Sequence, residues 1–307
     1  GVYAGNGSPK NVIDYITIAS IGNATDFGDL SAARQAIGGA SSTTRGIFSN
    51  GFSVPALANV IDYITIASTG NATDFGDASV SRRSCTAAAS STRMVIAGGI
   101  TPSLSDVIDY VTISSTGNAT DFGNLSSARY EAGGGSNSTR AIFSAGIASA
   151  SVNNVIDFIT IASTGNATDF GDLTATALGV QASASATKCV FAGGQPASLF
   201  DQVQFASLGN ATDYGDLVTG TNYHGCTDNS VRGIAMGGSD PSNDSTKRNV
   251  IQYWNLTSTG NSIDFGDLTS ARNNCQATTS NGHGGISLGE QPLSVTYMPG
   301  SGRGFTL

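Results

Sequence analysis

The stretch VIDYITIASTGNATDFGD, from Val60 to Asp77, decides the fold because close copies of it recur along the whole chain. Its second half, GNATDFGD, is found six times with small changes, starting at Gly22, Gly70, Gly117, Gly165, Gly209 and Gly260. Successive copies lie 48, 47, 48, 44 and 51 residues apart. A repeat of this length that contains several short strands is typical of a β-propeller. The recurrence also indicates that these residues belong to the scaffold.

Each repeat divides into four strand-like segments separated by turns. In the copy that follows Leu30, the segments are 31–40, 44–51, 59–67 and 72–76. The third segment is apolar on both faces, so it predicts a strand that is covered on both sides, as between adjacent blades. The first segment has the smallest side chains, which suits the crowded strand beside the propeller axis.

We therefore predict one all-β domain over residues 1–307, a β-propeller with four-stranded antiparallel blades of about 48 residues. A partial blade covers 1–30, full blades cover 31–78, 79–125, 126–173, 174–217 and 218–268, and a closing blade covers 269–307. This division gives seven blades. The alternative is six blades, in which the first strand of 269–307 completes the N-terminal blade. It ranks second because it leaves residues 284–298 without a place.

Composition restricts the function. The net charge of −8 argues against nucleic acid as a partner, because binding to nucleic acid needs a basic surface. No apolar run is long enough for membrane insertion. The four cysteines include no C-x-x-C pair and do not resemble a disulfide framework. The chain opens at Gly1 without a signal peptide, which is compatible with a processed product or a fragment.

Charged residues recur in the second and third segments. Their equal distances from the connecting loop predict cross-strand ion pairs. The predicted pairs are Arg45 with Asp62, Arg93 with Asp109, Arg140 with Asp157, and Lys188 with Asp201. Another arginine precedes the first segment in four repeats, as Arg34, Arg82, Arg129 and Arg272. These arginines either surround the channel entrance, where an anion could bind, or pair with nearby carboxylates and carbonyls; the second interpretation is favoured.

No motif predicts catalysis. The recurring Asp-Phe-Gly-Asp, first seen at Asp26 to Asp29, is interpreted as an Asx-type turn, with Ca²⁺ binding as the weaker alternative. His224 and His283 lie in different repeats without a suitably spaced carboxylate, and a surface or turn position is expected for them. We expect no enzymatic activity, no catalytic residue, no cofactor and no bound metal.

The loops between second and third segments vary in length and chemistry while the strands barely change. If the blades are equivalent, these loops lie on one face, and variable loops on a rigid scaffold commonly form binding surfaces. The alternative is unconstrained drift. The residues predicted to contact a ligand are Pro55, Leu57, Pro102, Leu104, Pro196, Asp240, Asn243, Asp244 and Lys247.

The order of the segments resembles a kelch repeat. That pattern has an arginine in the first strand, a glycine pair ending the second, a tyrosine in the third and an aromatic residue in the fourth. In one repeat these are Arg82, Gly98 and Gly99, Tyr110 and Phe122. The glycine pair is broken in two other repeats, and the first-strand arginine is missing from two.

Whole repeats, seen at 60–78 and 107–125, resemble repeats in virion structural and tail-fibre proteins of marine tailed phages, notably cyanophages. The resemblance implies a non-enzymatic virion protein, extracellular on the particle, that contacts other virion proteins and a host-surface glycan or receptor. One alternative is a secreted carbohydrate-binding lectin. A less favoured one is a propeller-fold glycan depolymerase, which needs arginine, tyrosine and carboxylate side chains clustered on one face. The repeats show these residues only at scaffold positions.

Overall fold

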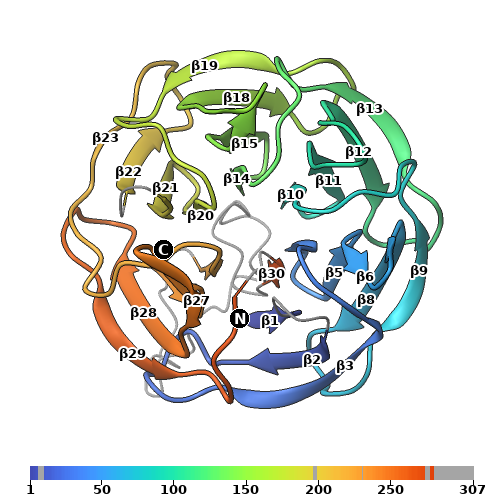
Figure 1. Cartoon of the computed structure of the whole chain (residues 1–307), viewed down its shortest axis with the longest axis horizontal. Helices are drawn as coiled ribbons and strands as arrows, with labels where there is room; N and C mark the ends of the chain where they lie inside the picture. The colour runs from blue at the N-terminus through green and yellow to red at the C-terminus, as the bar shows by residue number, and fades with distance from the viewer. Residues whose placement is uncertain (6–9, 196–198, 230, 274–276, 280–307) are drawn as a thin grey trace, which may run out of the picture.

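The computed structural model describes residues 1–5, 10–195, 199–229, 231–273 and 277–279. These residues form six four-stranded antiparallel sheets arranged as blades around a central axis (Figure 1). The described part of the chain contains strands and no helix. The predicted all-β propeller with antiparallel four-stranded blades is therefore confirmed.

The blades are numbered in chain order, and each is given from its inner to its outer strand. Blade 1 consists of β30 (Ala277–Thr279), β1 (Val2–Ala4), β2 (Lys10–Tyr15) and β3 (Thr25–Arg34). Blade 2 consists of β4 (Gly38–Ser41), β5 (Arg45–Ser49), β8 (Val60–Thr65) and β9 (Thr73–Asp77). Blade 3 consists of β10 (Thr86–Ala89), β11 (Arg93–Ala97), β12 (Val107–Thr112) and β13 (Thr120–Asn124).

The second half of the ring is built the same way. Blade 4 consists of β14 (Gly133–Ser136), β15 (Arg140–Ser144), β18 (Val155–Thr160) and β19 (Thr168–Asp172). Blade 5 consists of β20 (Gln181–Ala184), β21 (Lys188–Gly193), β22 (Leu199–Gln204) and β23 (Thr212–Asp213). Blade 6 consists of β24 (Gly225–Asp228), β25 (Arg232–Met236), β28 (Val250–Asn255) and β29 (Ile263–Asp267).

Short hairpins extend three of the loops between second and third strands. Blade 2 carries β6 (Phe52–Ser53) and β7 (Ala56–Leu57), and blade 4 carries β16 (Ile147–Ala148) and β17 (Ser151–Val152). Blade 6 carries β26 (Ser239–Asp240) and β27 (Asn243–Lys247). The loops predicted to vary thus differ in secondary structure as well as in sequence.

The ring is closed by strands from both ends of the chain. In blade 1, β30 supplies the inner strand, and Thr279 pairs with Val2 of β1. The preferred count of seven blades is therefore wrong, and the alternative of six is observed. Each terminal repeat lacks the strand that the other supplies, so one sheet formed from both satisfies the backbone hydrogen bonds of two partial repeats. Of the closing blade predicted over 269–307, residues 280–307 lie outside the described part of the chain.

The repeated GNATDFGD joins each blade to the next. Between blades 1 and 2, the backbone N–H of Ala72 donates to the carbonyl of Asp29 (2.7 Å), and the Asn71 side-chain oxygen accepts from the Asp29 N–H (3.0 Å). A side chain at Gly28, where φ is +149°, would clash with the carbonyl of Gly70. The asparagine bond recurs at all six junctions, through Asn23, Asn71, Asn118, Asn166, Asn210 and Asn261.

We call this repeated junction the latch. The expectation that the motif is scaffold agrees with its contacts, but its form is not the local Asx-type turn that was predicted. Its asparagine accepts a hydrogen bond from the neighbouring blade, 42 residues away in sequence at Asn71 and 41 residues away at Asn118. Because the last latch links Asp267 to Asn23, it also ties the two ends of the ring together.

Aromatic and cationic side chains reinforce blades 2, 3, 4 and 6 in the same way. Tyr63 meets Phe75 edge to face, with ring centroids 5.9 Å apart. The guanidinium carbon of Arg45 lies 4.6 Å from the Tyr63 centroid, and Nη1 donates to the Ile113 carbonyl of the next blade at 2.9 Å. The equivalent cations lie over the equivalent rings in three blades: Arg93 over Tyr110, Arg140 over Phe158, and Arg232 over Tyr253. In blade 5 the third-strand position is Gln202, and Lys188 lies instead over Tyr214 of the fourth-strand segment.

The predicted ion pairs between second and third strands are corrected by the strand register. Arg45 lies opposite Thr65, three residues beyond Asp62, and Asp62 lies opposite Phe48. The same offset places Arg93 opposite Thr112, Arg140 opposite Thr160, and Lys188 opposite Gln204, rather than opposite Asp109, Asp157 and Asp201. The prediction failed because it assumed that each hairpin is symmetric about the middle of its loop.

The aspartates pair instead with the arginines that precede the inner strands. Arg34 and Asp62 are fully buried and 2.5 Å apart. The equivalent pairs are Arg82 with Asp109 (3.0 Å), Arg129 with Asp157 (2.8 Å), and Arg272 with Asp14. These arginines do not surround the channel entrance as free cations, and the favoured interpretation of local pairing is the correct one. The pair of Arg272 with Asp14 joins the connection that precedes β30 to β2 of blade 1.

Candidate functional site

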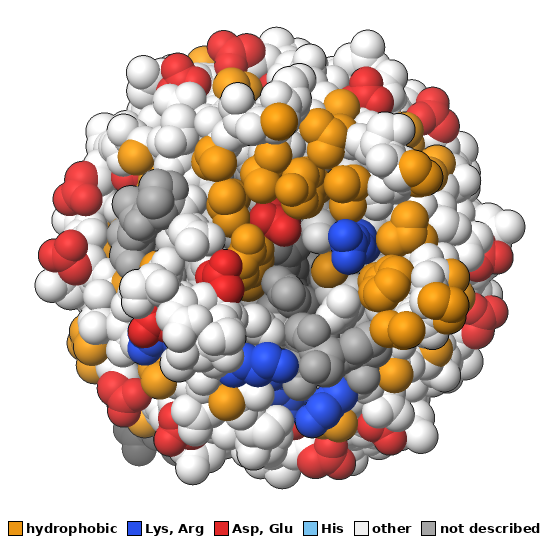
Figure 2. Space-filling model, in the orientation of Figure 1, with side chains coloured by type: hydrophobic (Ala, Val, Ile, Leu, Met, Phe, Trp, Pro, Cys, Tyr) orange, Lys and Arg blue, Asp and Glu red, His pale blue; other side chains and the backbone are white. Residues whose placement is uncertain are grey.

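The loops between second and third strands share one face of the ring with the connections between blades. Isolated bridges join the two kinds of loop within one blade, for example Gln35 with Phe52, Tyr130 with Ile147, and Asn222 with Ser239. We call this side of the molecule the loop face; it is the side seen in Figure 2. Hydrophobic side chains gather there over blades 2, 3 and 4, while acidic and basic side chains lie at the edge of a central hollow (Figure 2).

The structure places the predicted ligand-contacting residues on the loop face, in three blades. Pro55 and Leu57 belong to the hairpin of blade 2, and Pro102 and Leu104 lie in the loop of blade 3. The remaining described ones, Asp240, Asn243, Asp244 and Lys247, belong to the hairpin of blade 6. Pro196 lies outside the described residues. Ligand contact by any of these residues stays a prediction.

A series of backbone hydrogen bonds runs from blade to blade at the channel entrance on the loop face. Among the described residues, blades 2 to 6 each contribute the residue that lies two positions after the recurring arginine or its replacement. Ser84 N–H donates to the Ala36 carbonyl (2.8 Å), and Glu131 N–H donates to the Ser84 carbonyl (3.1 Å). Gly179 N–H then donates to the Glu131 carbonyl (3.1 Å), and Tyr223 N–H to the Gly179 carbonyl (3.2 Å). We call these five residues the mouth ring.

The mouth ring has one backbone geometry and five different side chains. The φ angles are +54° at Ala36, +53° at Ser84, +58° at Glu131, +67° at Gly179 and +51° at Tyr223. Such angles are uncommon for residues with a side chain, and they persist only where the surroundings enforce them. Since the backbone is constant, the side chains are what distinguishes one blade from another at this position.

Two side chains of the mouth ring meet across blade 5. The Tyr223 hydroxyl donates to Glu131 Oε2 at 3.2 Å, although the two residues belong to the entrances of blades 6 and 4. The Tyr223 ring lies over the backbone of Gly179, where a Cβ atom would be only 3.0 Å from ring carbon Cδ1. The glycine of blade 5 therefore makes room for the tyrosine of blade 6.

Burial shifts the protonation of this couple. It raises the pKa of Glu131 to about 7, while the Tyr223 hydrogen bond and the Arg83 charge act in the opposite direction and Asp244 adds to the rise. Burial, with the charges of Glu131 and Asp244, raises the pKa of Tyr223 well above its ordinary value. Tyr223 is thus a neutral hydroxyl, whereas Glu131 exchanges its proton near neutrality. Perturbed groups at a concave surface are typical of functional sites.

Further polar groups adjoin the couple. The Asn222 amide nitrogen donates to Asp244 Oδ1 at 2.7 Å and to Gln195 Oε1 at 3.4 Å. Arg83 is exposed, and its guanidinium carbon lies 5.4 Å from the centroid of Phe52. The channel entrance therefore combines carboxylate, phenol, amide and guanidinium groups from several blades.

Sequence reasoning did not find Glu131 or Tyr223. Both occupy a position where no two described repeats carry the same residue, two places after the position where Arg34, Arg82 and Arg129 recur. Aligning the copies with one another would have shown this contrast. Glutamate is absent elsewhere in the described part of the chain, which is a second signal.

His224 has no place in this site. It is fully buried rather than at the surface or in a turn, so that expectation is wrong. Its two ring nitrogens have no hydrogen-bond partner among the described residues, and burial lowers its pKa to about 3. His283 lies outside the described residues. The described cysteines, Cys85, Cys189 and Cys226, are buried and unpaired with one another.

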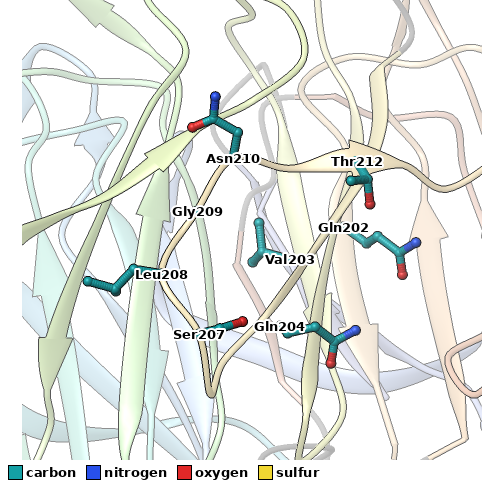
Figure 3. Close-up of a pocket in the computed structure, with 8 residues that line it drawn as sticks. All are labelled: Gln202, Val203, Gln204, Ser207, Leu208, Gly209, Asn210 and Thr212. Atoms are coloured by element: carbon teal, nitrogen blue, oxygen red, sulfur yellow. The ribbon is translucent and has the colours of Figure 1, made fainter.

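Shallow hollows recur beside the loops between third and fourth strands. In blade 5 such a hollow of about 190 Å³ lies between β22 and the loop around Gly209 (Figure 3). Equivalent hollows of about 160 and 150 Å³ lie beside Gly117 and Gly165 in blades 3 and 4. The hollow of blade 5 is lined by no charged side chain. Because the hollows accompany the latch in successive blades, we attribute them to the scaffold.

Comparison with models of known protein families gives no match, and a search of curated proteins also gives none. The fold therefore defines the class, a six-bladed β-propeller. Among the described residues, no group of three or more His, Cys, Asp or Glu side chains is placed to hold a metal ion. None of the described segments is a helix long and apolar enough to cross a membrane.

Proposed function

We propose that the protein is a non-enzymatic binding module that uses its loop face. The observation that carries this proposal is the contrast between the latch and the mouth ring. Within this one chain, the latch asparagine is present at all six junctions, while the five residues of the mouth ring are all different. A rigid ring with one diversified face suits recognition of an asymmetric partner.

We further propose that the module is part of an extracellular virion, as a tail appendage or structural protein. Its repeats resemble those of virion proteins of marine tailed phages. The partners would be other virion proteins, together with a glycan or receptor on the host surface. A secreted lectin would use the same face, and the location of the protein distinguishes these two forms of the proposal.

A glycan depolymerase is the second candidate, and one observation favours it. Arg83, Tyr223 and Asp244 each lie within electrostatic reach of Glu131 at the channel entrance, so the residue types that such an enzyme needs do occur together. The raised pKa of Tyr223 makes it a poor nucleophile, because its phenolate is disfavoured. Binding without turnover is therefore the better-supported function.

Two measurements test the proposal. The purified protein is applied to a glycan array and to candidate host cells, and the glycans are then analysed by mass spectrometry for shortened products. Binding without product release is expected. Product release that is lost in Glu131→Gln would establish the depolymerase instead, and no binding to glycans, cells or virion proteins would overturn the proposal. Proteomics of purified particles then separates a virion component from a secreted lectin.

A further inference from the structure

We propose that the channel entrance is a saccharide subsite in which Glu131 and Tyr223 hold one neutral sugar unit. This inference rests on the proposed binding function and deepens it by naming the site and the class of ligand. It concerns residues different from those in the variable hairpins.

The mouth ring does not need these two side chains. Ala36, Ser84 and Gly179 hold the same backbone hydrogen bonds with the same sign of φ, without any long side chain. Glutamate and tyrosine at a positive φ are strained, and Glu131 is also partly buried against its preference for water. Residues that are unfavourable for the fold, and that sister blades replace by small ones, indicate a use other than stability.

Gly179 gives a second, independent indication. A side chain at this position would press on the Tyr223 ring, whose carbon atoms lie 3.0 and 3.1 Å from the place of the missing Cβ. The same backbone conformation carries Ala36 in blade 2 and Ser84 in blade 3. Glycine is therefore not required by the ring itself, and its presence keeps the tyrosine in contact with Glu131.

The chemistry of the couple fits a sugar. A sugar hydroxyl both donates and accepts, and it can bond a carboxylate oxygen and a phenol oxygen at the same time. The tyrosine ring also presents an apolar face to the C–H groups of a pyranose. The amide of Asn222 lies nearby and donates to both Gln195 and Asp244. Such a set of convergent polar groups around a concave entrance is typical of small-ligand sites.

The negative charge at the channel entrance favours a neutral sugar over an acidic one. Besides burial, the charge of Asp244 raises the pKa of Glu131, and the whole chain carries a net charge of −8. A uronic or sialic acid would add a third carboxylate to this entrance. Arg83 offsets part of this charge, but it lies over Phe52. Repulsion among the carboxylates therefore disfavours anionic saccharides.

The test uses the full chain and a panel of methyl glycosides of neutral hexoses, with methyl glucuronide and sialic acid as acidic probes. Saturation-transfer NMR and titration calorimetry measure binding. Glu131→Gln and Tyr223→Phe each remove one polar contact, and Gly179→Ala displaces the Tyr223 ring while keeping every polar group. We expect each variant to weaken binding of the neutral hexose about tenfold or more, as for a buried hydrogen bond lost.

The matched control is Asp74→Asn, on an exposed latch residue far from the entrance in sequence, and it should bind like the unmodified protein. Thermal unfolding of all variants shows whether the ring remains folded. If the unmodified protein binds saccharides and the three variants bind equally well, the subsite is overturned while the binding function stands. Preference for the acidic probes would also overturn it. If the loop face binds only proteins, the subsite fails and the proposed module remains.

Discussion

Blades 2, 3 and 4 differ from blades 5 and 6 in how they fill one buried position. In the first group, an arginine before the inner strand pairs with an aspartate in the third strand, and both side chains are excluded from solvent. In blade 5 the arginine is Ala177, and Asp201 remains buried without it. In blade 6 both partners have changed, to Thr221 and Gln252.

The difference indicates that polar groups at this buried position must be hydrogen-bonded but need not be charged. Gln252 accepts from the Ser262 hydroxyl (2.8 Å) and donates to the Thr219 carbonyl (2.7 Å), so its amide is bonded at both ends. Thr221 donates to the Gly237 carbonyl at 2.9 Å. A buried ion pair can be replaced by neutral groups at little cost, whereas loss of one partner leaves an uncompensated charge. Blade 5 has the aspartate without the arginine, so a loss of stability from an uncompensated charge is expected there.

The largest effect is expected when a complete pair is broken. Arg82→Ala leaves Asp109 buried without its cation, and it should lower the free energy of unfolding by about 3–5 kcal/mol. Chemical denaturation with a two-state fit measures the change. The double variant Arg82→Thr with Asp109→Gln copies blade 6 and should recover most of the loss. If the double variant is no more stable than Arg82→Ala, the blade 6 solution depends on its own neighbours.

The sequence predicted the structural features that the repeats have in common, but not the contacts that differ from one repeat to another. The strands and the scaffold role of GNATDFGD followed from six copies of one pattern, because periodic apolar residues report burial directly. The number of blades did not follow from the pattern, because two partial repeats can combine with each other or with further strands. The pairing of β30 with β1 shows that they combine with each other. Such closure joins residues at opposite ends of the chain, where local pattern carries no information.

The buried pairs and the mouth ring were missed for a related reason. Asp62 was assigned to Arg45 because a symmetric hairpin was assumed, whereas the register is offset by three residues and Arg34 enters from the preceding connection. Glu131 and Tyr223 meet across a blade through an interaction that spans 92 residues. A pattern within a single repeat cannot predict a contact between residues that are so far apart in the sequence.

A smaller effect is expected at a buried histidine of blade 6. His224 occupies the position that other blades fill with Ile37 or Val180, and its ring nitrogens have no partner among the described residues. His224→Val removes two buried polar atoms, so the free energy of unfolding should rise by about 1 kcal/mol after the loss of some packing. Val180→Ala in blade 5 is the matched control and should destabilise through a cavity. If His224→Val is less stable than the unmodified protein, the packing of the imidazole contributes more to stability than its two unpaired nitrogens cost.

The smallest effect is expected at the unpaired carboxylate of blade 5. Burial raises the pKa of Asp201, while hydrogen bonds from the backbone and hydroxyl of Thr174 act in the opposite direction. Because the folded pKa lies above the unfolded value of about 3.9, the folded state binds the proton more tightly. This contribution to stability is present at low pH and is lost as the pH rises through the folded pKa. Asp201→Asn should therefore match the unmodified protein within about 1 kcal/mol at neutral pH and lack this pH dependence.

Denaturation curves for Asp201→Asn and Asp109→Asn distinguish blade 5 from the blades that have a complete ion pair. They are recorded from about pH 3 to 7, because the unfolded carboxyl group titrates within this range. Asp109→Asn leaves Arg82 buried without its anion and should cost about 3–5 kcal/mol. A comparable loss in Asp201→Asn would mean that Thr174 holds the carboxylate as firmly as an arginine does. In that case the absence of Arg in blade 5 is fully compensated, and blades 5 and 6 would have reached the same balance by different routes.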